Sequence, residues 1–462
     1  MNKNTAQDTI AAPATPIGEG GIGIVRLSGP RALDIADSVF VPKNVGKPSG
    51  CESYSVHYGH VTSGKKVVDE VLLTVMKAPK SYTKEDVVEI NCHGGIQATK
   101  EVLGLVLSRG ARLAEPGEFT RRAFLNGRID LAQAEAVLDV IRAKTEGSMK
   151  AAMAQLGGDL SKEVSGIIDE LIHIASHIEA AIDFPDEQLD IMKEENLSSR
   201  TAGTVARMRR LLDSFSEGAV LREGVLAVIC GKPNVGKSSL MNLLLKRDRV
   251  IVAPVPGTTR DAVEELINLK GVPVRLADTA GIGHVKDDLY KASSEKSRHY
   301  IERADIILLM LDASAVIDEE DLSVIRLVEG KKKIVVVNKT DLGRRIDKKS
   351  LSALFKQDVI IEMSVEKKEN IEALEKAVLG TVYSGTFSQA EGAIVTNARH
   401  KELLEKALES ASAALETMKE GSHPELMAVD IKDAMTALGF ITGRSVSDDI
   451  LDRVFSDFCI GK

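Results

Sequence analysis

The sequence has 462 residues, 44% of them hydrophobic and 28% charged, with a net charge of -8 and a pI near 5.7. A chain of this length exceeds what one compact core holds, so about three domains are expected. The acidic balance, the absence of tryptophan and an aromatic share of only 3% exclude a protein that grips nucleic acid mainly through a broad basic face or a base-stacking platform.

Residues 1–120 are expected to form a small α+β domain. Short β-type runs at 23–27, 71–76 and 87–90 stand beside one helical stretch at 97–108. Mixed runs of this kind, with no strict strand–helix alternation, favour an α+β arrangement.

Residues 121–220 are expected to be the first part of an all-α domain. Apolar residues recur at helical spacing over 129–184 until Pro185 ends the run, and a further helix is predicted over 197–215. No stretch of the chain approaches the roughly 18 apolar residues of a membrane span, so no membrane contact is expected.

The helical pattern is interrupted by an α/β domain. The apolar run 225–230 opens a region of buried strands and helices, assigned to residues 221–384, and helical spacing returns over 385–462. Helices on both sides of one α/β block predict a discontinuous helical domain with the α/β domain inserted into it.

A phosphate-binding loop is predicted directly after the strand 225–230. The segment 231–238 reads Gly-Lys-Pro-Asn-Val-Gly-Lys-Ser, and an amphipathic helix is expected to begin at Ser239. In a strand–loop–helix of this kind the backbone N–H groups point at phosphate oxygens, Lys237 neutralises the β and γ phosphates, and the hydroxyl of Ser238 binds Mg²⁺. The predicted nucleotide contacts from this element are Asn234, Val235, Gly236, Lys237, Ser238 and Ser239.

Two further segments complete a predicted triphosphate and Mg²⁺ site. The strand 272–276 leads to Asp278-Thr279-Ala280-Gly281, which places a carboxylate near the Mg²⁺ shell and the amide of Gly281 near the γ-phosphate. Between the two elements, Thr259 is the expected second hydroxyl on Mg²⁺. The predicted nucleotide contacts here are Asp278, Thr279, Ala280, Gly281 and the segment Ala253, Pro254, Val255, Pro256, Gly257, Thr258 and Thr259.

The base is predicted to be guanine. After the strand 334–337 come Asn338, Lys339, Thr340 and Asp341. A carboxylate at Asp341 accepts hydrogen bonds from N1–H and the N2 amine of guanine, whereas adenine presents an acceptor in place of the first donor. Ser364, after the strand 359–362, is a further predicted guanine contact. The substrate is therefore expected to be GTP.

The usual water-positioning group is missing from this predicted site. Many small GTPases carry Gln after the switch glycine, but here that residue is Ile282, whose alkyl side chain cannot hold water, and Arg260 is only a weak arginine-finger candidate. Asn234 suggests that K⁺ supplies the missing positive charge, with carbonyls of 253–258 completing the ion's shell. The alternative is that Asn234 only shapes the loop.

With these motifs in place, the whole chain resembles the tRNA modification GTPases of the wobble-uridine 5-carboxymethylaminomethyl pathway, in the TrmE-Era-Septin-like class of P-loop GTPases. The resemblance rests on the segments 16–26, 93–95, 116–127, 180–187 and the terminal Cys-Ile-Gly-Lys of 459–462. It implies an N-terminal domain that dimerises and binds a tetrahydrofolate one-carbon donor, and a GTPase domain activated when two copies meet with K⁺. It also implies a flavin-bearing partner protein, in a heterotetramer-type complex, and tRNA as the substrate to be modified.

The resemblance also implies roles for particular residues. The folate contacts fall on Arg26, Glu89, Arg128 and Lys462, and the K⁺ site on Asn234, Ala253, Val255 and Thr258. The family's switch glutamate aligns with Tyr290, which cannot act as a carboxylate base, so Asp287 or Asp288 is the substitute, with Asp288 assigned as catalytic beside Lys237, Asp278 and Gly281.

Cysteine usage is compatible with a reducing compartment, and the protein is expected in the cytoplasm. The four cysteines, Cys51, Cys92, Cys230 and Cys459, stand far apart with no CxxC pair, so neither zinc nor disulfides are expected. Cys459 is either a nucleophile in the modification or a small apolar residue near the end of the chain. Two other functions stay open: a ribosome-assembly switch GTPase without one-carbon chemistry, and a folate-binding transferase regulated by its GTPase domain.

Overall fold

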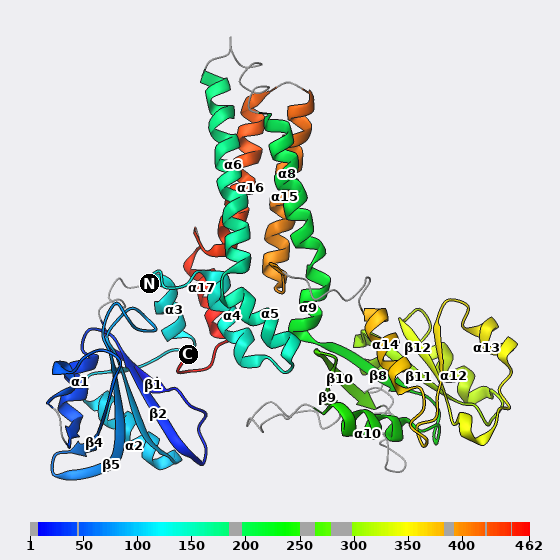
Figure 1. The fold of residues 1–462 in the computed structure, drawn as a ribbon, viewed down its shortest axis with the longest axis horizontal. Coiled ribbons are helices and arrows are strands. Elements are labelled where there is room, and N and C mark those ends of the chain that lie inside the picture. The colour runs from blue at the N-terminus through cyan, green and yellow to red at the C-terminus, as the bar shows by residue number, and fades with distance from the viewer. Residues whose placement is uncertain are drawn as a thin grey trace. The chain divides into compact units, whose positions relative to one another are not determined.

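The computed structural model describes residues 8–43, 46–183, 196–249, 264–278, 298–382, 392–420, 423–444 and 446–462 (Figure 1). The chain forms two compact units, Met1–Leu138 with Gly439–Lys462, and Asp139–Leu438. The domain limits expected at residues 120, 220 and 384 stay predictions. Pro185 and the predicted residues of 253–259, 279–282 and 287–290 lie outside the described residues, as does Arg260.

The first unit is built on a mixed sheet with strand order β3-β4-β5-β6-β2-β1-β7. Helices α1 and α2 pack on this sheet, and the apolar side chains between them form its core, with Val25, Leu27 and Ile90 fully buried. The bounds are β1 Ile10–Pro13, β2 Gly20–Ser28, α1 Ala32–Val39, β3 Phe40–Pro42, β4 Ser55–Ser63, β5 Lys66–Met76, β6 Val87–Gly94, α2 Ile96–Ser108 and β7 Arg112–Leu113.

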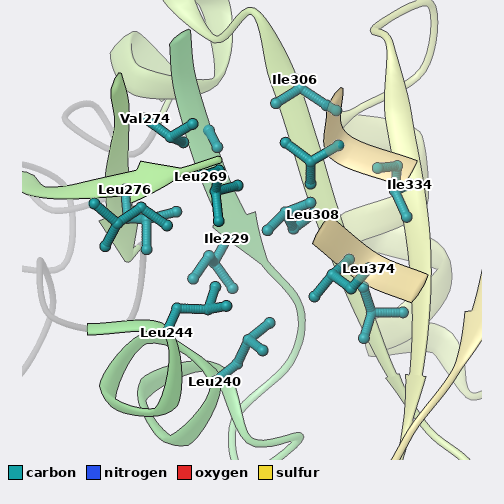
Figure 2. Close-up of a cluster of buried hydrophobic side chains, with 14 of the residues drawn as sticks. Ile229, Leu240, Leu244, Leu269, Val274, Leu276, Ile306, Leu308, Ile334 and Leu374 are labelled. Carbon is teal, nitrogen blue, oxygen red and sulfur yellow. The ribbon is translucent and has the colours of Figure 1, made fainter. Parts of the chain in front are cut away.

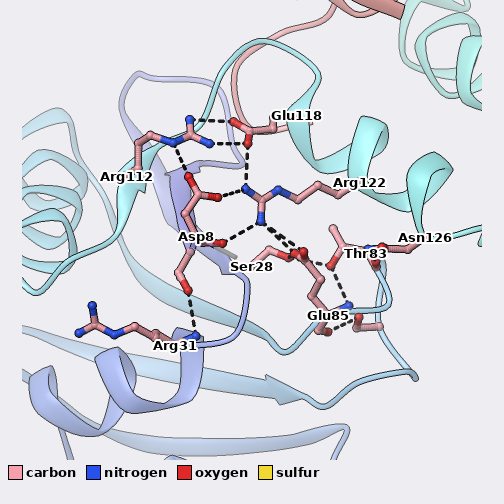
Figure 3. A network of polar contacts seen from close by, with 11 residues as sticks. Asp8, Ser28, Arg31, Thr83, Glu85, Arg112, Glu118, Arg122 and Asn126 are labelled. Atoms are coloured by element: carbon pink, nitrogen blue, oxygen red, sulfur yellow. Dashed lines mark hydrogen bonds and ion pairs between the residues drawn. The ribbon is translucent and has the colours of Figure 1, made fainter. Parts of the chain in front are cut away.

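A buried polar network joins the sheet to helix α3 (Glu118–Leu125). The guanidinium of Arg122, whose side chain is 7% exposed, pairs with Asp8 at 2.6 Å, Glu118 at 2.9 Å and Glu85 at 3.2 Å (Figure 3). Arg112 pairs with the same Asp8 and Glu118. Burial works to raise the pKa of Glu118, but the two arginines outweigh it and hold that pKa below its usual range. The motif 116–127 therefore includes a charge cluster that fixes α3.

The end of the chain returns to the first unit. Phe455 of helix α17 (Asp448–Ser456) and Phe458 just after it form a buried cluster with Leu131 and Leu138 of α4 (Leu131–Arg142). Beyond α17, Ile460 forms an antiparallel bridge with Pro116. The last residues are thus held against residues far earlier in the sequence, next to the sheet.

The second unit contains long helices and a second sheet. The helices are α5 Glu146–Leu156, α6 Asp159–Asp183, α8 Leu197–Asp213, α9 Phe215–Glu223, α15 Ala398–Glu420 and α16 Pro424–Thr442. Helix α6 buries one stripe, with Val164, Ile167, Leu171, Ile174 and Ile178 at spacings of three and four residues. This apolar stripe is buried because the other long helices pack beside α6 (Figure 1).

The second sheet has the order β13-β12-β11-β8-β10-β9, parallel except for β9. Helices α10 and α14 pack on one face, where Leu240, Leu244 and Leu374 meet Ile229 and Leu308 (Figure 2). Helix α13 and the segment 298–303 pack on the other face. The bounds are β8 Val225–Cys230, α10 Lys237–Asp248, β9 Glu264–Leu269, β10 Val272–Asp278, β11 Ile306–Asp312, α12 Glu319–Leu327, β12 Lys333–Asn338, α13 Lys348–Leu354, β13 Val359–Glu362 and α14 Ile371–Val382.

The predicted fold class is confirmed: an α+β N-terminal part, helices before and after, and an α/β P-loop part between them. Two predicted helix limits are wrong. Helix α10 begins at Lys237 rather than Ser239, because Gly236 takes the left-handed conformation (φ 104°) and caps the helix there. The helix predicted over 197–215 ends at Asp213, and α9 begins at Phe215.

Candidate functional site

The phosphate-binding loop connects β8 to α10 and uses left-handed backbone at two places. Asn234 has φ 64° and Gly236 has φ 104°. A Cβ atom at Gly236 would collide with the side-chain amide of Asn338, so only glycine fits there. The helix that follows has no side-chain cap, which leaves its first N–H groups available to an anion.

Lys237 is held over this loop. Its side chain is buried, and Nζ donates to the carbonyl oxygens of Gly231 at 2.7 Å and Lys232 at 2.8 Å. Burial lowers the pKa of Lys237, and the charge of Asp278 opposes that shift without reversing it. An ammonium has three N–H donors, so two bonds to the loop leave one for a phosphate oxygen.

Ser238 and Asp278 form the pair expected at a Mg²⁺ site. Strands β8 and β10 are parallel neighbours with Asp278 opposite Ile229, so β10 ends beside the loop that follows β8. The Ser238 hydroxyl donates to Oδ2 of Asp278 at 2.8 Å, and Asp278 is 5% exposed. A hydroxyl and a carboxylate are oxygen ligands of the kind that Mg²⁺ prefers, so this pair fits the ion.

Asn338 connects the phosphate end of the site to the base end. Its side-chain amide donates to the carbonyl oxygen of Val235 at 2.8 Å and accepts from the backbone N–H of Val365 at 3.0 Å. Asn338 is buried, so its role in these contacts is to fix two loops against each other. Of the other predicted contacts, Ser239 lies on α10, and Thr340 lies in the turn directly after β12.

Asp341 is exposed and oriented by Ser364. The hydroxyl of the fully buried Ser364 donates to Oδ1 of Asp341 at 2.6 Å. Lys339, in a left-handed conformation with φ 64°, pairs through Nζ with Asp312 at 2.7 Å. The structure therefore brings Asp341 and Ser364 together, with Ser364 placed behind the carboxylate; direct contact of Ser364 with guanine stays a prediction.

A second cluster lies in the first unit, where β2 and β6 pair with Arg26 opposite Glu89. Nε of Arg26 donates to Oε1 of Glu89 at 2.8 Å, and Nη1 donates to the carbonyl oxygen of Gly461 at 3.3 Å. The guanidinium of Arg128 lies 4.7 Å from the centroid of the Tyr82 ring, and that of Arg26 lies 5.8 Å from it. The four predicted folate contacts are far apart in the sequence but lie close together in the fold: Arg26, Glu89, Arg128 and Lys462.

Lys462 belongs to the same cluster. Burial lowers the pKa of its ammonium, the charge of Arg26 lowers it further, and Glu89 opposes the shift. Cys459, three residues earlier, is exposed. Tyr82 was not predicted from the sequence, because a single tyrosine in a loop carries no motif. Phe119 belongs to the 116–127 motif, but its contact with Arg26 was not predicted; its ring centroid lies 5.6 Å from the Arg26 guanidinium.

Several predicted site residues lie outside the described residues. These are Ala253, Pro254, Val255, Pro256, Gly257, Thr258 and Thr259, then Thr279, Ala280 and Gly281, and the base candidates Asp287 and Asp288 with Tyr290. In the described ranges, no group of three or more His, Cys, Asp or Glu side chains could hold a metal ion. No helix in the described part of the chain is long and apolar enough to cross a membrane.

Comparison with known proteins gives two family matches. The model of the MnmE helical domain matches residues 131–459, and that of the GTP-binding protein TrmE N-terminus matches residues 9–128. A tRNA modification GTPase MnmE of Carboxydothermus hydrogenoformans is 46% identical, over 99% of this chain and 100% of the relative. One of Alkaliphilus metalliredigens is 47% identical, over 98% of this chain and 99% of the relative.

Among solved structures, an Era protein of Aquifex aeolicus bound to GDP·AlF4⁻ is 28% identical, with a TM-score of 0.28, over 40% of this chain and 66% of that chain.

Proposed function

The chain belongs to the MnmE family of tRNA modification GTPases, and we propose that, with a flavin-bearing partner protein, it adds a carboxymethylaminomethyl-type group to C5 of the wobble uridine of certain tRNAs. GTP is its substrate. The observation that carries the proposal is the set of Lys237, the Ser238–Asp278 pair and the Asp341–Ser364 pair, which lie at the carboxyl ends of strands of one sheet. That edge is where open α/β sheets bind their ligands.

The proposed hydrolytic site works by positioning charge. The loop N–H groups and Lys237 offset the negative charge on the β and γ phosphates, and Asp341 selects guanine. Ser238 and Asp278 would hold Mg²⁺, which when bound neutralises phosphate charge. The base that activates water is proposed to be Asp288, since Ile282 and Tyr290 have no suitable group.

We propose K⁺ as a further cofactor, bound where two GTPase domains meet. Asn234 supports this, because it is exposed on the loop with a left-handed backbone and so stands on the accessible side of the phosphate site. Ala253, Val255 and Thr258 would supply the other oxygens. A cation at this place acts as an arginine finger does in other GTPases.

The cluster in the first unit is proposed to hold the tetrahydrofolate one-carbon donor. Arg26, Arg128 and Lys462 provide positive charge for an anionic ligand, Glu89 accepts hydrogen bonds from ring N–H donors, and Tyr82 offers an aromatic edge. Cys459 is exposed next to this cluster, which supports a role in the modification. Because tRNA is the substrate class, we place the protein in the cytoplasm. We propose a homodimer because the proposed K⁺ site needs two GTPase domains to meet.

The experiment that tests the function is reconstitution of the modification. The full chain, the flavin-bearing partner, tRNA, GTP, the one-carbon donor for the methylene carbon and glycine for the carboxymethylamino part are combined, and the modified wobble uridine is measured by mass spectrometry. The wild-type chain is expected to form product, Lys237→Ala to lose both GTP hydrolysis and product, and Cys459→Ser to lose product while hydrolysing GTP. GTP hydrolysis without any modified uridine in the wild-type reaction would favour the ribosome-assembly switch instead.

The K⁺ proposal has its own measurement. The GTP hydrolysis rate is followed against K⁺ concentration at constant ionic strength, with Na⁺ as the balancing ion, with and without the partner. The rate is expected to rise with K⁺, and equal rates in K⁺ and Na⁺ would remove K⁺ from the account.

A further inference from the structure

The second residue of the phosphate-binding loop, Lys232, sends its side chain out of the loop and onto helix α12. Nζ donates to Oδ2 of Asp318 at 2.8 Å and to Oδ2 of Asp321 at 2.7 Å. The side chain of Lys232 is 13% exposed and that of Asp321 is 5% exposed. The phosphate-loop pattern leaves this position unrestricted, so the general chemistry of the loop does not require a cation here.

The two carboxylates are themselves fixed by the start of α12. Oδ1 of Asp318 accepts from the backbone N–H of Asp321 at 3.0 Å, and Oδ2 of Asp321 accepts from the backbone N–H of Asp318 at 3.2 Å. This reciprocal capping box holds both side chains in place. The other oxygen of Asp321, Oδ1, is buried without a hydrogen-bond partner. Lys232 is thus the cation that makes a buried carboxylate tolerable.

The charges support a firm attachment. The Lys232 ammonium, together with the backbone N–H of Asp321, lowers the pKa of Asp318 to about 2. Burial works to lower the pKa of Lys232, but the hydrogen bonds to the two carboxylates outweigh it and raise that pKa. Lys232 and Asp318 therefore both stay charged across the neutral pH range.

The main chain of Lys232 faces the nucleotide site. Its carbonyl oxygen accepts from Nζ of Lys237 at 2.8 Å, beside the carbonyl oxygen of Gly231, which accepts from the same atom at 2.7 Å. One residue is therefore joined to α12 by its side chain and to the ammonium of Lys237 by its carbonyl. Pro233 follows directly, and its ring restricts the backbone between the two attachments.

We propose that Lys232 is a positioning residue for GTP hydrolysis, because its ion pairs with Asp318 and Asp321 fix the carbonyl oxygens that orient the ammonium of Lys237. The inference rests on the proposed assignment of Lys237 to the β and γ phosphates. If the attachment is lost, the loop N–H groups and Asp341 still bind the nucleotide, while the ammonium moves relative to the transferring phosphoryl group. The loss is then in kcat rather than in KM.

The experiment measures kcat and KM for GTP hydrolysis, with the melting temperature, on the full chain with Mg²⁺ and K⁺. Lys232→Met is expected to lower kcat at least about tenfold, because a small displacement of a charged group is costly in phosphoryl transfer, and to leave KM within about threefold. Lys232→Arg is expected to keep kcat within about threefold, since a guanidinium reaches both carboxylates.

The chain offers a matched control. Lys333 is also 13% exposed and pairs with Asp358 at 3.5 Å, at the start of β12 and away from the nucleotide edge. Lys333→Met removes an ion-paired lysine of equal exposure from the same sheet and is expected to keep kcat within about twofold of wild type. Comparison of the two methionine variants separates a positioning role from the mere loss of a buried charge.

Two further variants make every outcome decisive. If Lys232→Met does not fold, Asp318→Asn takes its place, because the Asp318 side chain is 54% exposed and its change to asparagine is mild; kcat is expected to fall at least about threefold with KM unchanged. The inference is overturned if the folded variant has the same kcat as Lys333→Met. It is also overturned if the fold decrease in kcat is no larger than the fold increase in KM.

Lys237→Ala distinguishes this failure from that of the site itself. Full turnover in Lys237→Ala would remove the phosphate assignment altogether. Loss of turnover in Lys237→Ala with a neutral Lys232→Met would remove only the role of Lys232.

Discussion

At the scale of single residues, the proposed choice of guanine depends on Asp341. Its carboxylate is exposed, and the buried hydroxyl of Ser364 holds one of its oxygens at 2.6 Å. Guanine offers two N–H donors to this carboxylate. Xanthine has a carbonyl in place of the N2 amine, so it suits an amide better, because the amide oxygen accepts from N1–H while its NH₂ donates to that carbonyl.

Asp341→Asn is therefore expected to weaken GDP binding about 10- to 100-fold and to strengthen binding of xanthosine diphosphate. Calorimetric titration of the full chain with both nucleotides measures the change. Asp358→Asn, which removes a carboxylate paired with Lys333 at the far end of β12, is the control and should leave both affinities as they are. An unchanged guanine preference in Asp341→Asn would mean that the base lies elsewhere.

His93 gives a prediction for pH. Its Nδ1 lies 2.7 Å from Oδ1 of Asp69, and the hydrogen bond to that carboxylate raises the pKa of the exposed ring above its ordinary value. A raised pKa in the folded state means that the pair stabilises the fold below the unfolded pKa of about 6.5, and that this contribution is lost as pH rises through the folded pKa. An NMR titration should show His93 titrating above its ordinary value, and returning to it in Asp69→Asn. Identical titrations of the two proteins would rule the pair out.

Site residues could be proposed from the sequence where the chemistry is local. Lys237 and Ser238 are neighbours in one loop, so a motif names them, and the structure places Ser238 against Asp278. Lys232 was not singled out, because its partners Asp318 and Asp321 stand 86 and 89 residues away. Tyr82 was missed for the same reason: it meets Arg128 only through the fold.

At the scale of elements, the start of helix α5 is fitted closely to the turn between β9 and β10. The Thr145 hydroxyl caps the helix by accepting from the backbone N–H of Ser148, and it donates to the carbonyl oxygen of Gly271 at 2.5 Å. A Cβ atom on Gly147 would collide with that same carbonyl oxygen. Strand β10 continues from this turn to Asp278, so the contact connects a helix to the strand that ends at the nucleotide site.

Gly147→Ala is expected to destabilise the second unit by about 1–3 kcal/mol, because the backbone oxygen in its way cannot rotate aside. Gly203 in α8 has open space where a Cβ atom would lie. Gly203→Ala should therefore stabilise the folded state by about 0.5–1 kcal/mol, because alanine lowers the conformational entropy of the unfolded chain. Calorimetric unfolding of the two variants should therefore show melting temperatures displaced in opposite directions. Displacement of both in the same direction would contradict the close contact.

Some elements with a strong apolar pattern were predicted well, whereas β11, which is also strongly apolar, was not named. Strands β8 and β13 have the limits expected from their apolar runs. Strand β4 was not predicted, because its exposed and half-buried residues alternate with few fully buried ones, so its sequence carries little apolar signal. Helix α10 starts two residues early for a backbone reason, the left-handed Gly236, that hydrophobic spacing does not report.

At the scale of the whole molecule, the order of helical and α/β regions along the chain could be predicted from the sequence, but the division into two compact units could not. The sequence indicates an α/β block between two helical stretches, and the structure has that order. It does not indicate that residues up to Leu138 and those from Gly439 onward form one compact unit, because that pairing depends on contacts such as Phe455 with Leu131 across more than half the chain.

The central proposal is that Lys237 holds a triphosphate whose base is selected by Asp341. Isothermal titration calorimetry of the purified full chain with GDP, GTP, ADP and ATP tests this directly. Guanine nucleotides are expected to bind at least about 100-fold more tightly than adenine nucleotides, because adenine leaves the carboxylate without its two donors. Equal affinity for the two bases would contradict the account.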